Sequence, residues 1–267
     1  MAYASWIPAA CAADSSLLGL APADSDALIG INLKQIRESD LGERTLAEVG
    51  PDNPGYKEFA TTACFDPFRD PDEVLIAAPA TQHPKAPMML RGSFDAAKLA
   101  QLAADGGMVP ADCHGVQILS RAAHQEGFSA LAIIDRALVV RGNQAGVQAF
   151  VDRRGQTAVL KVGLAAKPAD AFKANDIWVV LQAAPAAFAP ESATSGHMGP
   201  LLQSIEQASL GLKVGSDVVL FVNVVTHTPQ AAEGLAAALR VFSWMAGAKQ
   251  KDNKQVAAPA PSPAPQA

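Results

Sequence analysis

The chain has 267 residues, of which 49% are hydrophobic and 18% are charged, and its formal net charge is −5. A nucleic-acid-binding protein needs an excess of cations to meet phosphate, and a disordered chain carries fewer apolar residues, so the composition argues against both classes. Three cysteines are too few for a disulfide scaffold. What remains is a globular protein with one large or two small domains.

The first residues resemble the end of a secretory signal. An Ala-Cys-Ala motif centred on Cys11 fits the small residues before a cleavage site, although no Lys or Arg precedes Lys34 to supply the cationic start. Residues 1–20 are therefore predicted to be either a signal-peptide remnant or a disordered N-terminus. A lipid anchor at Cys11 is a further alternative, which Pro8 disfavours because a lipoprotein signal has Leu at that position.

Residues 21–156 are predicted to form a first α+β unit. Its expected elements are a strand over 27–33, a helix capped by Asn32 that runs to about 49, a short helix over 56–64, strands over 73–78 and 87–94, a helix capped by Asp95 and ended by Gly106, strands near 108–113, 116–121, 128–134 and 137–142, and a helix that Asn143 caps and Gly155 ends.

A shorter α+β unit is predicted over 157–247. Its expected elements are a strand over 176–183, a helix containing Leu201, Leu202 and Ile205, strands over 208–214 and 217–227, and a helix begun by Thr228 and Pro229 with an apolar stripe of Leu235, Ala238, Leu239, Phe242 and Met245. Residues 248–267 alternate Ala and Pro and are predicted to be a disordered tail. No stretch reaches the 18 apolar residues of a transmembrane segment.

The order strand–helix–strand–strand–helix occurs over about 27–106 and again over about 176–247. It matches the first five elements of a split β-α-β unit. The sequence therefore predicts an α+β fold with a mostly antiparallel sheet, helices on one face, and two similar units. The repeat depends on element order alone, because the sequence identity between the two copies is slight.

Cysteine and histidine spacing indicates neither a metal centre nor a cofactor. None of the five His lies two to four residues from another, and neither a G-x-S-x-G elbow nor a phosphate-binding glycine loop occurs. Cys113 and His114 are adjacent, and in a strand their side chains would point to opposite faces. Cys64 and Cys113 could form a disulfide in an oxidising compartment or remain two unpaired thiols.

The densest acidic segment contains Asp66, Asp70, Asp72 and Glu73. Two Asp-Pro pairs there are first of all turn signals, because Asp bonds its own backbone and Pro fixes φ. The four carboxylates are also weak candidates for a hard-cation site, although their spacing is not that of an EF-hand. The sequence offers no catalytic or cofactor-binding residue beyond this segment.

Several motifs resemble a group of uncharacterised exported bacterial proteins, of the domain-of-unknown-function kind. They are Pro22–Asp26 before a strand, Ser39–Gly42, Phe65–Asp70 before Glu73–Pro79, Arg91–Asp95 before a helix, and the last helix over 231–246. The resemblance covers most of 20–247 and implies export and a repetitive α+β body. Its motifs are turns and caps, so it implies no catalytic residue.

Together these observations predict an exported protein of the periplasm or cell envelope that acts as a non-catalytic binding or interaction module. Its expected partner is an unidentified protein or envelope component. The alternative function is a hydrolase whose Ser or Cys nucleophile meets a His only in three dimensions. The alternative location is the cytoplasm, if the first residues carry no signal.

Overall fold

The computed structural model describes residues 17–50, 53–63, 65–66, 68–79, 86–121, 129–156, 160–161, 164, 171, 174–182, 200, 203–237 and 240. Its strands are β1 (Ala27–Asn32), β2 (Pro71–Ala78), β3 (Met88–Gly92), β4 (Val109–Cys113), β5 (Val116–Ser120), β6 (Ala130–Ile133), β7 (Leu138–Gly142), β8 (Ile177–Leu181), β9 (Ile205–Val214) and β10 (Val218–Thr226). Its helices include α2 (Leu33–Arg37), α3 (Asp40–Glu48), α4 (Pro54–Ala63), α5 (Ala96–Asp105) and α6 (Gln144–Asp152). A further helical stretch spans 229–237.

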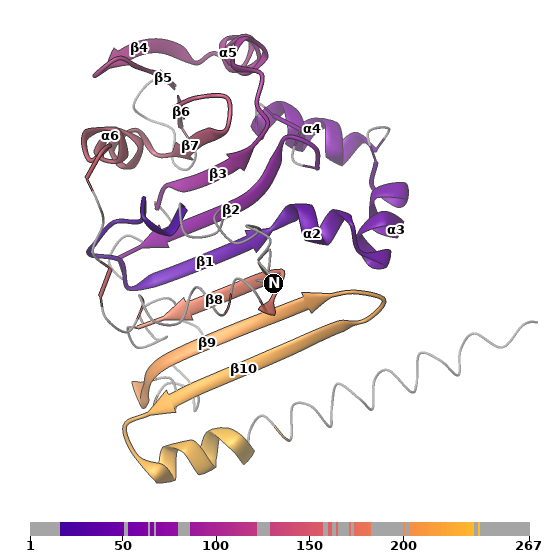
Figure 1. Cartoon of the computed structure of the whole chain (residues 1–267), viewed down its shortest axis with the longest axis vertical. Helices are drawn as coiled ribbons and strands as arrows, with labels where there is room; N and C mark the ends of the chain where they lie inside the picture. The colour runs from indigo at the N-terminus through magenta and orange to yellow at the C-terminus, as the bar shows by residue number, and fades with distance from the viewer. Residues whose placement is uncertain are drawn as a thin grey trace, which may run out of the picture.

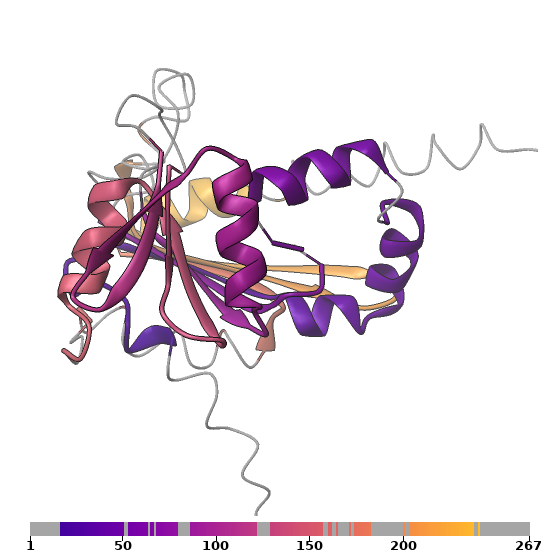
Figure 2. The same ribbon diagram turned by 90° about the horizontal axis from the view of Figure 1, so that it is seen from above.

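All ten strands form one sheet in the order β10-β9-β8-β1-β2-β3-β7-β6-β5-β4, as Figure 1 shows. Every neighbouring pair is antiparallel. The chain starts near the middle with β1, builds the half that ends at β4, and returns to add β8, β9 and β10 beside β1. Figure 2 shows the twist of this sheet, whose magenta and pink strands stand steeply to the orange β9–β10 hairpin. The predicted α+β class and antiparallel sheet are confirmed.

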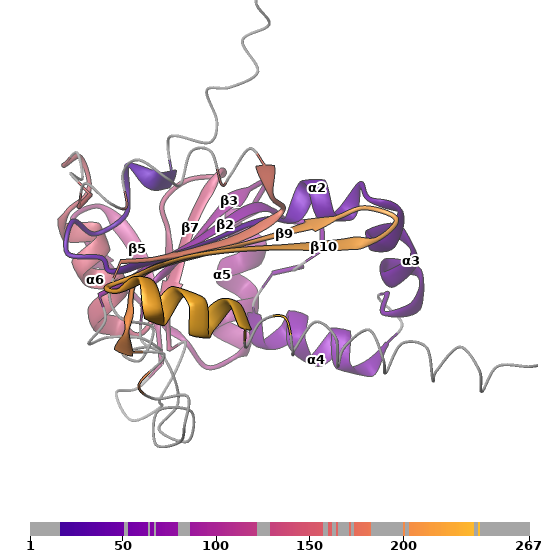
Figure 3. The ribbon, with the colours of Figure 1, turned by 90° about the horizontal axis from the view of Figure 1, so that it is seen from below.

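Two hydrophobic clusters lie on opposite faces of the sheet, because alternate residues of each strand point to opposite sides. Leu75 and Val140 belong to the cluster that packs against α6, whereas Val74 and Val139 belong to the cluster that packs against α5. Figure 3 shows α4 and α5 on the same side of the sheet. Helices therefore cover both faces, and the expectation that they lie on one face is wrong in this detail.

The strand order also differs from a split β-α-β unit. In such a unit the first helix separates two parallel strands, whereas here β1 pairs directly with β2 in antiparallel orientation. The strands β1, β2 and β3 are consecutive neighbours, and so are β8, β9 and β10. The two predicted units thus contribute to one sheet, and the internal repeat stays a prediction.

Most predicted elements are present with small shifts, but two predicted helices differ in where they end. The helix expected over 33–49 is divided into α2 and α3, because Ser39 leaves the helix and begins a new one by accepting a hydrogen bond from Gly42 N at 3.1 Å. Residues 200 and 203 of a later expected helix are helical, but Ile205, expected in the same helix, is the first residue of β9. The last predicted helix does begin at residue 229, and Ala231 N donates to Thr228 Oγ1.

The pairing of β1 with β8 joins the two halves of the sheet. Gly30 lies opposite Trp178, whose side chain is fully buried over it. A Cβ atom on Gly30 would lie 2.1 Å from Cε2 of Trp178, so only glycine leaves room for the indole ring.

Asp176 fixes the start of β8 between β1 and β9. Its backbone carbonyl accepts from Asn32 N at 2.7 Å and its backbone N–H donates to Leu212 O at 2.9 Å. The fully buried carboxylate accepts from Lys213 Nζ at 2.7 Å and from Val214 N at 2.6 Å. The buried charge is therefore paired and hydrogen-bonded, as such a group must be.

Gly30→Ala tests this junction. We expect the free energy of unfolding to fall by about 1–3 kcal/mol or more, because the added methyl group must displace the indole ring in a packed core. Gly215→Ala is the matched control, since the nearest atom to its new Cβ is 3.8 Å away. Urea denaturation measures both variants, and equal stabilities would contradict the assigned contact.

Candidate functional site

The first part of the acidic segment is a self-contained turn. Asp66 Oδ1 accepts from Phe68 N at 3.0 Å and from the hydroxyl of Tyr56, and Asp66 N donates to Asp70 Oδ2 at 2.7 Å. The Tyr56 ring stacks on Phe68 with ring centroids 5.5 Å apart. These contacts bind α4 to the entry of β2, as expected of an Asp-rich turn.

The second part of the segment is paired with arginines. Asp72 Oδ1 lies 2.5 Å from Arg37 Nη2, and Glu73 Oε2 lies 3.6 Å from Arg91 Nη1. Asp66, Asp70, Asp72 and Glu73 therefore have protein partners and do not converge on one point. Among the residues that the structure describes, the group whose ligand atoms lie within reach of one metal ion is a different one.

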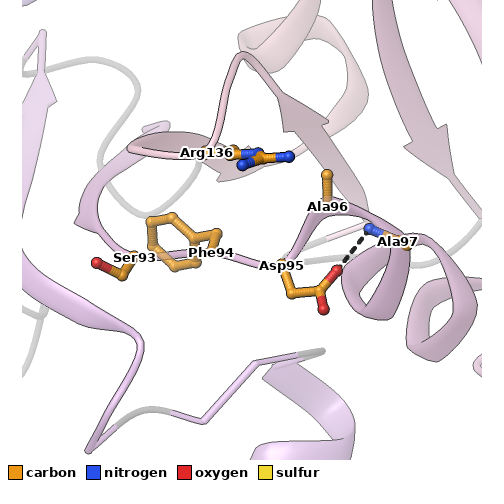
Figure 4. Close-up of a pocket in the computed structure, with 6 residues that line it drawn as sticks. All are labelled: Ser93, Phe94, Asp95, Ala96, Ala97 and Arg136. Carbon is orange, nitrogen blue, oxygen red and sulfur yellow. Dashed lines mark hydrogen bonds between the residues drawn. The ribbon is translucent and has the colours of Figure 1, made fainter.

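A pocket of about 720 Å³ lies at the start of α5. Figure 4 shows the Asp95 carboxylate turned toward Ala97 N, with Arg136 on the other side of the chain. Asp95 Oδ1 accepts from Ala97 N at 3.0 Å and from Lys98 N at 3.1 Å, so it already satisfies the helix donors that would otherwise bind an anion. Arg136 is the cation among the described residues that line this pocket, and none of these is a histidine, a cysteine or a second carboxylate beside Asp95.

The metal-capable group is Cys113, His114 and Asp152, whose ligand atoms all lie within 4.8 Å of one another. Cys113 ends β4, His114 sits in the turn to β5, and Asp152 is the last residue of α6. The expectation that Cys113 and His114 point to opposite faces is wrong, because His114 has φ 52° and has left the extended conformation. Cys113 is a free thiol, whereas Cys11 and Cys64 lie outside the described residues.

This group is poorly suited to nucleophilic catalysis. Desolvation, followed by the carboxylates of Asp152 and Asp112, raises the pKa of the Cys113 thiol above its ordinary value. A cysteine nucleophile needs a lowered pKa, which a neighbouring cation or helix N-terminus would supply. The arrangement therefore gives the hydrolase alternative no activated thiol at Cys113.

The sequence missed this group because Asp152 is far from Cys113 along the chain. One usable signal was the run Asp112-Cys113-His114-Gly115, in which a short polar turn between strands bends the backbone at His114 and Gly115. The structure bears this out: Gly115 has φ 76°, and its N–H donates to Asp112 Oδ1 at 3.2 Å.

Among the described residues, most of the exposed large apolar side chains lie on the β9–β10 hairpin. We call this group the hairpin surface, defined by Leu210, Val218, Val219, Leu220, Phe221, Val222 and Val225, each of which is exposed by 36–55%. Single exposed apolar residues are ordinary, whereas seven neighbouring ones on the two faces of one hairpin are typical of an interaction site. The sequence signal was the uncharged run over 218–222, which was interpreted only as a strand.

A groove of about 590 Å³ adjoins the hairpin surface. On one face of the sheet, Ser209 and Gly211 of β9 are small and lie between Val180 of β8 and Phe221 of β10. The side chain of Asn175 lies over Gly211. Asn175 borders this groove, and the described residues give its buried Oδ1 no hydrogen-bond partner. The hairpin thus offers both a protruding apolar strand and a recess beside it.

Comparisons with known proteins identify a fold and no family. No family model and no curated protein matches the chain. Among solved structures, crystal form I of TP0453 matches with a TM-score of 0.51 and 11% identity, covering 78% of this chain and 77% of that one. Crystal form III of TP0453 matches with a TM-score of 0.52 and 9% identity, covering 83% and 85%. At such identities the likeness is one of fold.

In the described part of the chain, none of the helices has both the length and the apolar character needed to span a bilayer.

The Tyr56–Asp66 contact predicts a pH dependence. Burial, and then the hydrogen bond to Asp66, raise the pKa of Tyr56 from 10.0 to about 12. Because the folded state favours the protonated phenol, this stabilisation is fully present below pH 10 and is lost as the pH rises through about 12.

The chain has two tyrosines, so Tyr3→Phe leaves Tyr56 as the single phenol. In that variant, ultraviolet absorbance should give a phenol titration with a midpoint near pH 12. The free energy of unfolding of a Tyr3→Phe/Tyr56→Phe double variant should lack the corresponding decline. A phenol that titrates at its ordinary pKa in the folded protein would refute the contact.

Proposed function

We propose that this chain is a non-catalytic interaction module of an exported, periplasmic or cell-envelope protein, and that it associates through the hairpin surface. The signal-like motif around Cys11 and the resemblance of its turn motifs to exported proteins support export. The observation that carries the interaction is the exposure of every residue from Val218 to Val222 in a strand at the sheet edge.

The outer edge of β10 is unpaired among the described residues. Its nine residues, Val218–Thr226, contain neither a charged residue nor a proline. At about 3.4 Å per residue they offer about 30 Å of backbone donors and acceptors. The single register shift in its pairing, between Val225 and Thr226, lies at the strand end and leaves most of the edge regular.

The opposite edge of the sheet is protected. Edge strands usually carry charge, proline or bulges that prevent pairing with other chains. β4 has Pro110 and Asp112 within its five residues, whereas β10 contains neither a proline nor a charged residue. The contrast within one sheet indicates that the β10 edge is covered in the functional state.

The partner that fits the β10 edge is the β10 edge of a second copy of this chain. An antiparallel two-fold axis at Val222 would place Val219 opposite Val225 and Leu220 opposite Val224 of the other copy. Such pairs stabilise a sheet, and no like charges meet because the strand has none. The exposed side chains on both faces of β10 would then contact their symmetry equivalents.

Sedimentation velocity of the full chain over a range of concentrations tests this proposal. The wild type should form dimers. Val222→Lys should weaken self-association at least about tenfold, because two ammonium groups would meet at the two-fold axis.

The matched control is Val109→Lys, which places the same charge on the protected edge strand at a residue that is 66% exposed. This variant should dimerise like the wild type, and circular dichroism should show all three proteins folded. A wild type that stays monomeric, or equal dimerisation of the two variants, would overturn the second copy as occupant.

A further inference from the structure

A cluster of side chains that could bind a metal ion lies at the β4 end of the sheet, far from the β9–β10 hairpin. Cys113, His114 and Asp152 come from two elements whose positions are fixed independently. The β4–β5 turn is held by the Gly115 N–H, which donates to Asp112 Oδ1 at 3.2 Å. The helix α6 is held by Val147, Phe150 and Val151, which are buried in the core. Asp152 follows Val151 directly and is thereby brought to the turn.

Two of the separations between donor atoms lie near those around a tetrahedral zinc ion, and all three are within 4.8 Å. With bond lengths of about 2.3 Å to sulfur and about 2.0–2.1 Å to nitrogen and oxygen, a tetrahedron has N–O edges of about 3.3 Å and S–O edges of about 3.6 Å. His114 Nε2 lies 3.3 Å from Asp152 Oδ1, and Cys113 Sγ lies 3.9 Å from the same atom. The sulfur–oxygen separation would have to shorten by about 0.3 Å to reach the tetrahedral edge.

We propose that Cys113, His114 and Asp152 form a Zn²⁺-binding site. Thiolate, imidazole and carboxylate are the three ligand types that zinc takes in proteins, whereas calcium and magnesium would reject the sulfur. A pocket of about 370 Å³ is lined by His114 and Asp152, so water or a further donor could reach a bound ion from that side.

The accessibility of the site suits binding from solution. The side chains of His114 and Asp152 are 73% and 49% exposed, and Cys113 is half-buried. Without metal, the His114–Asp152 pair is a surface contact of little energetic value. On binding, Zn²⁺ replaces the thiol proton of Cys113, which passes to the buffer, and the sulfur lone pair forms the new bond.

The surrounding charges balance the bound ion. A thiolate and Asp152 supply two negative charges against the divalent ion, and Asp112 adds a third beside Cys113. Arg154 lines the adjoining pocket and supplies a positive charge on its side. Bound zinc would join the β4–β5 turn to the end of α6, two elements otherwise linked there by weak polar contacts.

Titration of the full chain with Zn²⁺ and Co²⁺ under a non-thiol reductant tests the site. Isothermal calorimetry should give one Zn²⁺ per chain. Co²⁺ should produce the near-ultraviolet charge-transfer band of a cobalt–thiolate bond. Cys113→Ser should abolish that band, and Cys113→Ser and Asp152→Asn should each weaken Zn²⁺ binding at least about tenfold.

Two matched controls separate the site from the rest of the chain. Cys64→Ser removes another thiol and should leave the cobalt band intact. Asp105→Asn changes the exposed last residue of α5, as Asp152 is the last residue of α6, and should leave Zn²⁺ affinity unchanged. Absence of one-to-one binding, or binding that survives Cys113→Ser and Asp152→Asn unchanged, would overturn the proposal.

Discussion

The architecture depends on the antiparallel pairing of β1 with β8. β1 belongs to the first strands of the chain and β8 to the last, so this one ladder makes a single sheet of two separately built halves. It tolerates no side chain at Gly30, because Trp178 fills that space. Asp176 then aligns β9 with the same junction through Lys213 and Val214, so the position of the exposed hairpin follows from a buried contact.

The sequence predicted the local structure well, because local signals determine it. Asn32, Asp95 and Asn143 each accept a hydrogen bond from the first turn of the helix that they were expected to cap. Short apolar runs bounded by turn residues located the strands of the sheet, with ends shifted by a few residues. The order of the strands was harder to predict from the sequence. The pairing of β8 with β1 depends on how Trp178 packs against Gly30, and these two residues are almost 150 positions apart in the chain.

The environments of the acidic segment and of the hairpin surface were harder to predict, for different reasons. The acidic segment looked like a site in the sequence, but Arg37 and Arg91 come from other elements and neutralise Asp72 and Glu73. The apolar run of β10 was predicted only as a strand, since a run of valines does not reveal whether a further layer covers it. Their exposure follows from their place at the end of the sheet order.

The unequal edges of the sheet limit how the protein can assemble. A chain with two open edges could add copies at both ends and grow into a filament, whereas Pro110 and Asp112 make the β4 edge a stop. If two copies pair through β10 as proposed, each uses its unprotected edge and the assembly would close after two copies. A sheet with one unprotected and one protected edge would in this way limit its own assembly to two copies.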